Sequence, residues 1–294
     1  MVSGSAPRRD SARSGGELPR NGVAMKGNMQ PDEQYGERPA PGENARRENL
    51  RIYEESWSEW LDMKRYGPSS RWLRALILDA LRSLRTEPRS ILDVGCGEGN
   101  VTQLLARQFR GAGVIGTDQS SEAIRLARVR YTDANLTFRV ESRGGAPEPR
   151  FDLVACMEVL EHVDDWRRFL DELCDRSGRC LLLSFPTGRM RAFEKHVGHV
   201  RNFFPGEVEK HLEGRGFLPL SVAYAGFPFY SPIYREICQL TDAGANAFTR
   251  GRYTWKQKAV SEVLLFAFRR LSTQRRWGDQ FVGLFLRSGA GLQS

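Results

Sequence analysis

The sequence predicts an α/β protein built on a mostly parallel sheet with helices on both faces. From Ser90 onward, short apolar runs of strand length alternate with longer segments whose apolar residues recur at helical spacing. This alternation is typical of parallel strands joined by crossover helices. Three glycines at alternate positions follow the first of these strands, which indicates a turn that a ligand can approach closely.

Seven segments have the length and composition of strands. They are residues 91–94, 113–117, 136–140, 151–156, 179–184, 217–223 and 279–287. Helical spacing predicts intervening helices at residues 100–109, 121–131, 165–175 and 205–211. Two further helices are expected at the N-terminal side as a helical cap, with Gly67-Pro68 between them and Ser69 or Ser70 capping the second.

Roughly fifty residues separate the last two predicted strands, which is too long for a plain connection. We therefore expect a helical insertion at about residues 228–276. This region holds eight basic residues and one acid, Glu262, between Arg250 and Arg276, and the net charge of the whole chain is +8. Such a segment is either a cap helix with a solvated basic face or a surface for phosphate, nucleic acid or peripheral membrane contact. The cap helix is favoured.

Composition favours one elaborated domain. The chain has 294 residues, of which 40% are hydrophobic and 27% charged. Residues 1–46 contain almost no large apolar residues, which predicts a disordered tail followed by a domain over 47–294. With no secretory signal and no apolar run of about 18 residues, a cytoplasmic location is expected. The five cysteines lack metal-site spacing and are interpreted as buried thiols.

The strongest chemical signal is the run Asp93-Val-Gly95-Cys-Gly97-Glu-Gly99-Asn100. Glycine is needed where the backbone turns sharply against a ligand, and the helix that follows adds free N–H donors. A dinucleotide loop would require glycine at position 100, where asparagine stands. Asp93, two residues before the first glycine, suits a cationic ligand that carries an amino acid. Asp118 closes the second strand, where a carboxylate can accept hydrogen bonds from ribose hydroxyls.

In these residues the sequence resembles the class I, S-adenosylmethionine-dependent methyltransferases. The resemblance rests on residues 93–99, 116–118, 151–163 and 178–186. It implies a Rossmann-like, seven-stranded sheet whose seventh strand is antiparallel, and S-adenosyl-L-methionine as cofactor. The three glycines would line the methionine part of the cofactor, and Asp118 would hold its ribose. Met157 and Glu158 would lie beside the cofactor and the acceptor.

Two further cofactor contacts are expected. Members of the family often place an acidic residue after the third strand to hold the adenine amino group, and here Glu141 or Ser142 occupies that position. Arg71 is expected either to pair with the carboxylate of the cofactor or to be a surface arginine.

The loop after the fifth strand carries two histidines, His196 and His199. Residues 198–203 resemble a Gly-His-x-Arg-x-aromatic segment of a bacterial branch of these enzymes. Ligands bind at the carboxyl ends of parallel strands, and histidine suits removal of a proton from a hydroxyl or an amine. His199, His196 and Glu158 are the catalytic candidates, and the alternative is that the histidines fix the loop by hydrogen bonding. His162 is interpreted as packing beneath the cofactor loop.

The favoured hypothesis is O-methylation of a hydroxyl on a small or medium-sized metabolite, such as a natural product, a quinone or a sugar-containing compound. N-methylation of a metabolite amine is the close alternative, followed by methylation of nucleic acid or protein and by a non-enzymatic, cofactor-binding regulatory subunit. The residues after the fourth strand, Cys156-Met157-Glu158-Val159, argue against a nucleic-acid target. No paired metal-ligand motif is visible, so the sequence predicts no metal and disfavours a magnesium-assisted, catechol-type site.

Overall fold

The computed structural model describes residues 57, 59–141, 150–237 and 251–289, apart from the side chain of His196. The chain divides into two units, Met1–Pro39 and Ala40–Ser294, and the described residues all belong to the second. Two predictions, the disordered tail over 1–46 and the adenine contact of Ser142, lie outside the described residues. The boundary at residue 46 stays a prediction.

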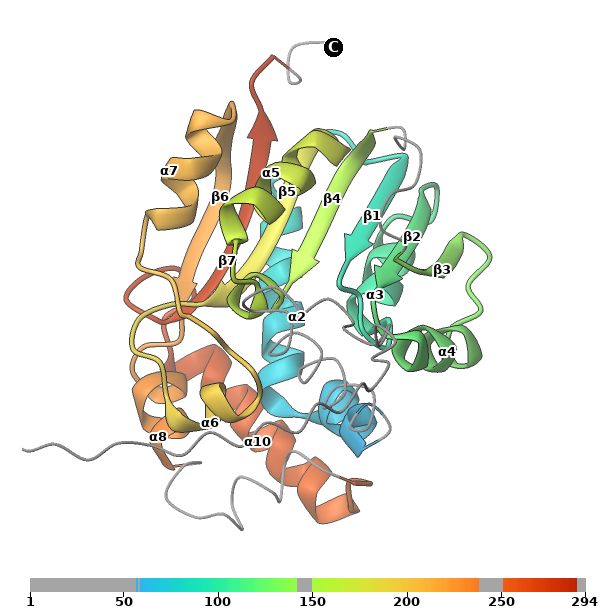
Figure 1. The fold of residues 1–294 in the computed structure, drawn as a ribbon. Helices are drawn as coiled ribbons and strands as arrows, with labels where there is room; N and C mark the ends of the chain where they lie inside the picture. Colours follow the sequence, from blue (N-terminus) through green and yellow to red (C-terminus); the bar gives the residue numbers. More distant parts are fainter. Residues whose placement is uncertain (1–56, 58, 142–149, 238–250, 290–294) are drawn as a thin grey trace, which may run out of the picture. The chain divides into compact units, whose positions relative to one another are not determined.

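One seven-stranded sheet organises the described part of the chain (Figure 1). Its strands are β1 (Ser90–Val94), β2 (Gly113–Asp118), β3 (Leu136–Val140), β4 (Phe151–Met157), β5 (Ser177–Pro186), β6 (Phe217–Ala225) and β7 (Gln280–Arg287). Their order in the sheet is β3-β2-β1-β4-β5-β7-β6. The first five strands pair in parallel, and β7 runs antiparallel to both β5 and β6. The predicted sheet with an antiparallel seventh strand is confirmed.

Helices cover both faces of this sheet, as predicted (Figure 1). The helices are α2 (Pro68–Leu81), α3 (Asn100–Gln108), α4 (Ser121–Arg130), α5 (Trp166–Arg176), α6 (Ala192–His196), α7 (Glu207–Gly214), α8 (Arg235–Ile237) and α10 (Trp255–Leu271), with short helical turns η1 (Leu160–His162) and η2 (Phe229–Tyr234). Apolar side chains of α2, α3 and α10 form one core with the sheet, and those of α5 and α7 form a second. Successive residues of β1 alternate between the two cores, Ile91 in one and Leu92 in the other, because strand side chains alternate in direction.

Two predicted helix starts were wrong by two or three residues. Gly67, not Ser69 or Ser70, is the N-cap of α2, and Pro68 takes the first helical position, where its missing N–H costs nothing. Helix α7 begins at Glu207 instead of Pro205, because Gly206 lies between them with a left-handed backbone (φ 85°).

The N-terminal helices and the insertion pack on each other. Residues 59–66 are helical and precede α2, and Trp72 of α2 is buried against the insertion. Its ring centroid lies 4.5 Å from that of Tyr230 and 5.8 Å from that of Phe268 on α10. Its indole N–H donates a hydrogen bond to Gln274 Oε1 at 2.9 Å. The predicted cap and insertion therefore form one helical layer against the sheet.

The outer side of α10 remains partly apolar, with Val263 and Phe266 exposed beside Arg269 and Arg270. A surface hollow of about 470 Å³ on this helix is lined by residues that include Glu262 and Phe266. Across the described ranges, no helix is long and apolar enough to cross a membrane. Peripheral membrane contact and a cytoplasmic location stay predictions.

Replacing Phe268 by alanine is expected to lower the free energy of unfolding by about 3–5 kcal/mol, the cost of emptying a buried aromatic site. Phe268 is 0% exposed, whereas Phe266 on the same helix is 65% exposed. The matched control Phe266→Ala should change this free energy by about 0.5 kcal/mol or less. Urea unfolding measures both, and equal effects of the two substitutions would contradict the packing of α10 on the sheet.

Candidate active site

The strand order reverses between β1 and β4, which places a crevice at the carboxyl ends of these two strands. From β1 the chain proceeds to β2 and β3 on one side, and then returns to β4 on the other. Ligands of open parallel sheets bind at such a switch point, because the connections leave in opposite directions there. The loop after β1 carries Gly95, Gly97 and Gly99, and the segment after β4 runs from Glu158 to His162.

The glycine loop has backbone conformations and contacts that exclude side chains. Gly95 and Gly97 have φ angles of 72° and 55°, in the left-handed region that favours glycine. A Cβ atom on Gly97 would lie 2.6 Å from the indole of Trp57, and one on Gly95 would lie 2.4 Å from Val159. The N–H of Gly95 donates a hydrogen bond to the carbonyl of Thr117 at 2.8 Å, which joins the loop to β2.

Asp118 lies at the carboxyl end of β2 and contacts the glycine loop. Its Oδ2 accepts a hydrogen bond from the Gly97 N–H, and its Oδ1 accepts one from the Ser120 N–H, both at 2.8 Å. Burial raises the pKa of this carboxyl, and the two backbone N–H groups lower it. Each carboxylate oxygen can accept a second hydrogen bond, so the group can hold the loop and a diol together.

Asp93 lies in β1, two residues before the first glycine of the loop. It is 1% exposed, and its Oδ2 accepts a hydrogen bond from Thr102 Oγ1 of α3 at 2.7 Å. Burial raises the pKa of Asp93 to about 7 against the effect of that hydrogen bond. The contact with Thr102 joins β1 to α3 and so supports the loop, and a direct contact of Asp93 with the cofactor stays a prediction.

These features fit S-adenosyl-L-methionine. The loop is a run of glycines with positive φ angles after β1, the Asp118 carboxylate lies at hydrogen-bonding distance from it, and Met157 adds an apolar side chain at the end of β4. Gly95, Gly97 and Gly99 would then hold the methionine portion and Asp118 the ribose hydroxyls. When bound, this sulfonium cofactor supplies a methyl group that is already activated for transfer, so the chain needs only to align and deprotonate an acceptor.

Two other predicted cofactor residues are engaged elsewhere. The Arg71 guanidinium makes two hydrogen bonds to the Glu262 carboxylate on α10, at 2.5 and 3.1 Å. Its pairing with the carboxylate of the cofactor stays a prediction, with Glu262 as its competitor. Glu141 accepts a hydrogen bond from Thr117 Oγ1 at 2.9 Å and pairs with Arg176 at 2.7 Å. An adenine contact of Glu141 stays a prediction, with Arg176 as its competitor.

Glu158 follows β4 directly and is held in a strained backbone conformation. Its φ angle is 55°, which is uncommon for a residue with a side chain and clusters at functional sites. Its Oε1 accepts hydrogen bonds from Ser184 Oγ at 2.8 Å and from Gln280 Nε2 at 3.0 Å. These contacts from β5 and β7 orient the carboxylate at the switch point. Neither Ser184 nor Gln280 was predicted from the sequence, because both are distant from Glu158 along the chain.

His162 and His199 form a pair of imidazole rings. Their ring centroids lie 4.7 Å apart at 84°, so His162 packs against His199. Its position beneath the glycine loop stays a prediction. Burial lowers the pKa of His162 to about 4 and that of His199 to about 3, the latter with a smaller effect of the neighbouring His162. Both rings are therefore neutral at pH 7. A base of such low pKa is a weak proton acceptor, which makes His199 poorly suited to general-base catalysis.

Glu161 joins the histidine pair. One ligand-type atom from each of Glu161, His162 and His199 lies within 4.8 Å of the others. The sequence predicted no metal site, since these residues lack the spacing of a known metal motif. The close spacing Glu158-x-x-Glu161-His162 was the available signal, and His199 joins it only through the fold. The side chain of the third catalytic candidate, His196, lies outside the described residues.

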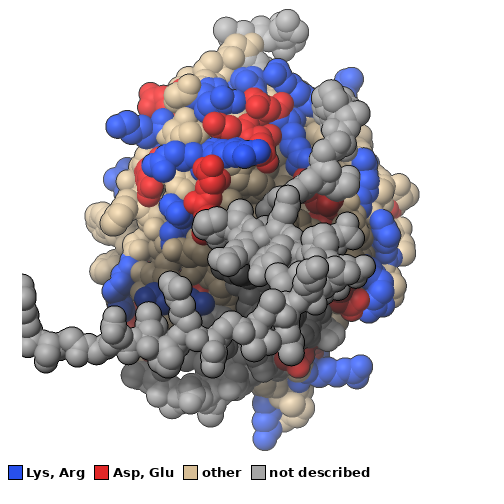
Figure 2. Space-filling model, viewed as in Figure 1, with Lys and Arg blue, Asp and Glu red and all other residues tan. Residues whose placement is uncertain are grey.

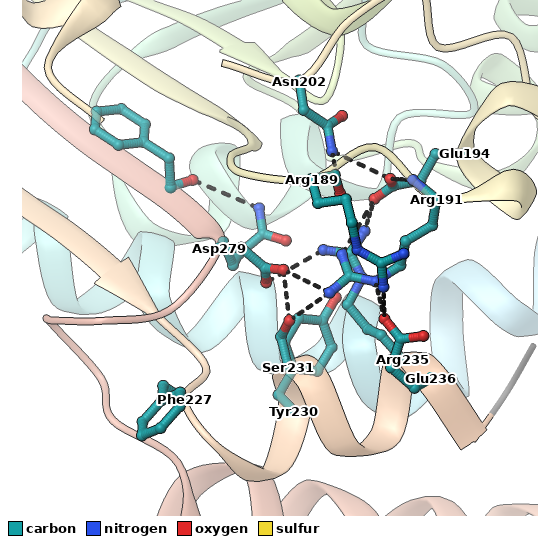
Figure 3. Close-up of polar contacts among 12 residues, drawn as sticks. Arg189, Arg191, Glu194, Asn202, Phe227, Tyr230, Ser231, Arg235, Glu236 and Asp279 are labelled. Carbon is teal, nitrogen blue, oxygen red and sulfur yellow. Dashed lines mark hydrogen bonds and ion pairs between the residues drawn. The ribbon is translucent and has the colours of Figure 1, made fainter. Parts of the chain in front are cut away.

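The loop that carries His199 is anchored by the fully buried carboxylate of Glu194 (Figure 3). Its Oε2 accepts hydrogen bonds from the Arg191 N–H at 2.6 Å and from Asn202 Nδ2 at 3.1 Å, and its Oε1 pairs with Arg235. The backbone carbonyl of Glu194 accepts a hydrogen bond from the His199 N–H at 2.9 Å. The position of His199 is thus coupled to the insertion that supplies Arg235.

Arg191 completes this buried network (Figure 3). Its guanidinium donates to Ser231 Oγ at 2.9 Å and pairs with Asp279 at 2.9 Å and with Glu236 at 3.0 Å. Arg235 also pairs with Asp279, at 3.3 Å. The positive and negative groups compensate one another, as buried charges require.

Fold and site together define an S-adenosyl-L-methionine-dependent methyltransferase. A family model described as "Methyltransferase domain" matches residues 66–218. Because that match spans more than half of the 294 residues, the chain belongs to this family of methyltransferases. The cofactor is S-adenosyl-L-methionine, so the predicted class, enzyme and cofactor are confirmed.

Curated relatives and solved structures are similar to parts of the chain. A protein of Alkalilimnicola ehrlichii named "Ubiquinone biosynthesis O-methyltransferase" is 45% identical over 84 residues, which are 27% of this chain and 33% of that protein. One of the same name from Hahella chejuensis is 30% identical over 131 residues, 42% of this chain and 54% of that protein. The chain thus spans a third to about half of the length of these relatives.

A putative methyltransferase of Haloferax volcanii, solved in complex with the Trm112 methyltransferase activator, superimposes with a TM-score of 0.53. The superposition covers 80% of this chain and 97% of that one at 16% identity. At that identity the similarity is one of fold.

Asp118→Ala is expected to weaken the binding of S-adenosyl-L-methionine by about 1.5–3 kcal/mol, or about 10- to 150-fold, the scale for losing hydrogen bonds to a charged group. Titration calorimetry with the cofactor measures the change. Asp175→Ala on the exposed side of α5 is the matched control and should bind like the wild type. Unchanged affinity in Asp118→Ala would remove Asp118 from the cofactor site.

Proposed function

We propose that this methyltransferase acts on oxygen and transfers its methyl group to a hydroxyl on a quinone- or phenol-type ring. The observation that carries the proposal is the Glu158 carboxylate, held at the switch point beside the glycine loop by Ser184 and Gln280. A hydroxyl must lose its proton as it attacks the methyl group, and a positioned carboxylate can accept that proton.

The names of the curated relatives support the choice of acceptor. Proteins named "Ubiquinone biosynthesis O-methyltransferase" are similar to part of this chain, over a third to about half of their own length. A ring hydroxyl is the acceptor that this name implies for those proteins. Such hydroxyls ionise more readily than alcohols, so a carboxylate base with limited strength suffices for them.

The distribution of charge argues against nucleic acid as the acceptor. Figure 2 shows basic and acidic side chains intermixed on one face of the described residues, without a continuous basic stripe. Arg168 on α5 is paired with Glu172, and Arg215, directly after α7, is paired with Asp171 and Asp175 of α5. Binding to a phosphate backbone requires unpaired cations arranged along a face. N-methylation of a metabolite amine is the remaining enzymatic alternative.

Methyl-labelled S-adenosyl-L-methionine distinguishes these functions. The full chain should transfer label to catechol and to hydroxylated quinols, and should not transfer it to the matched ortho-phenylenediamine, to RNA or to protein. Glu158→Gln is expected to lower kcat by about 10²- to 10⁴-fold, the usual contribution of general acid–base catalysis. Its affinity for the cofactor should stay at the wild-type value.

Asp175→Ala serves again as the control for the transfer assay. Label on the diamine would replace O-methylation by N-methylation, and label on RNA or protein would overturn the acceptor class. Binding of the cofactor without transfer to any fraction, including a lipid extract of the source cells, would favour a binding-only subunit.

A further inference from the structure

The Glu161 carboxylate is buried without a hydrogen-bond partner in the described part of the structure. Glu161 is 0% exposed, and neither of its side-chain oxygens accepts a hydrogen bond there. Removing a carboxylate from water costs several kcal/mol unless it is paired or coordinates a metal. Protonation alone does not resolve the problem, because the resulting O–H would also lack an acceptor.

Two imidazoles complete a donor set around this carboxylate. One ligand-type atom from each of Glu161, His162 and His199 lies within 4.8 Å of the others. His162 Nδ1 lies 3.0 Å from the Gly198 carbonyl oxygen. A carbonyl only accepts, so Nδ1 carries the proton and donates, and the lone pair of this ring is on Nε2. Metal-binding histidines are oriented in this way, with one ring nitrogen donating to a carbonyl or carboxylate.

The backbone of His199, which supplies the second imidazole, is held in place by hydrogen bonds. The His199 N–H donates to the Glu194 carbonyl, and the next residue, Val200, donates its N–H to the Glu161 carbonyl at 2.9 Å. The loop after β5 is thereby joined to the turn after β4 at the donor set itself.

The turn that holds Glu161 and His162 follows a residue that contacts the glycine loop. Val159, between Glu158 and the η1 turn that holds Glu161 and His162, approaches within 2.4 Å of the position a Cβ on Gly95 would take. A cation bound here would therefore lie at the same edge of the sheet as the activated methyl group.

We propose that Glu161, His162 and His199 bind a divalent first-row transition-metal ion that also takes the oxygen of the acceptor. Two imidazoles and one carboxylate suit Mn²⁺, Fe²⁺, Co²⁺ or Zn²⁺ better than Mg²⁺ or Ca²⁺, which prefer oxygen ligands. Three protein ligands leave coordination positions open, as catalytic sites require. Binding of the acceptor oxygen by the cation rests on the proposed O-methylation. The cation site itself does not depend on that proposal.

The cation would make the hydroxyl of the acceptor more acidic. A bound divalent ion lowers the pKa of an oxygen ligand and so allows its proton to leave at neutral pH. The proton would go to the Glu158 carboxylate or to water. The oxygen lone pair then forms the new O–C bond to the methyl carbon, while the C–S bond breaks and its electron pair stays on sulfur. No oxidant or reductant is required.

Mn²⁺ binding to the full chain, stripped of metal by a chelator, tests the site without using activity. The loss of the electron paramagnetic resonance signal of free Mn²⁺ should give one equivalent bound, and bound Mn²⁺ should raise the Tm. Glu161→Gln and His199→Gln are each expected to weaken Mn²⁺ binding at least tenfold and to abolish the rise in Tm. His211→Gln is the matched control. His211 lies on α7 and pairs with Asp171 at 2.8 Å, outside the proposed metal site, so this variant should bind Mn²⁺ as the wild type does.

Each outcome decides the proposal. The absence of Mn²⁺ binding by the folded wild type, or equal binding by Glu161→Gln, His199→Gln and His211→Gln, would overturn the site. Circular dichroism of each variant separates loss of binding from loss of fold, and the two substitutions lie on different segments, so one folded variant suffices. Methyl transfer to a hydroxyl that persists in excess chelator would reject the metal while leaving O-methylation intact. Mn²⁺ binding without methyl transfer to a hydroxyl would keep the metal site and reject O-methylation.

Discussion

The reversal of strand order between β1 and β4 is the constraint on which the site depends. Because the connections leave these neighbouring strands in opposite directions, their carboxyl ends border one crevice. The glycine loop follows β1, and Glu158 with its turn follows β4. The contact between Val159 and Gly95 is the direct result, and it leaves no space for a side chain at Gly95. The glycine loop and the Glu158 carboxylate therefore adjoin because of topology.

A second constraint is the burial of charge in the loop after β5. Glu194 is fully buried and is compensated by Arg235 from the insertion, while Arg191 is compensated by Asp279, which precedes β7. Removing one partner from such a group leaves an uncompensated charge, so its members are stable only together. The loop inherits that rigidity through the hydrogen bond from His199 to the Glu194 carbonyl. The insertion thus supports the catalytic edge in addition to covering the sheet.

Features of the fold that depend on nearby residues were predictable from the sequence. The β1 strand and the glycine loop are encoded by a continuous apolar run and by glycines that adopt positive φ, and Asp118 by its place at the end of a strand. Features that depend on distant partners were not. Arg71 meets Glu262 across 191 positions, and the donor set containing Glu161 and His199 exists only because β4 and β5 pair in parallel. Spacing along the chain carries no record of such contacts.

The most direct test of the central claim, that methyl donor and cation share one edge of the sheet, is the relaxation of the donor methyl group by Mn²⁺. S-adenosyl-L-methionine carrying a ¹³C methyl group would be bound to the chain without acceptor, and its methyl resonance recorded with Mg²⁺ and with Mn²⁺. Adjacent sites predict strong broadening by Mn²⁺ that is lost in His199→Gln. A methyl resonance of equal width with both ions, while the cofactor and Mn²⁺ are bound, would contradict the claim.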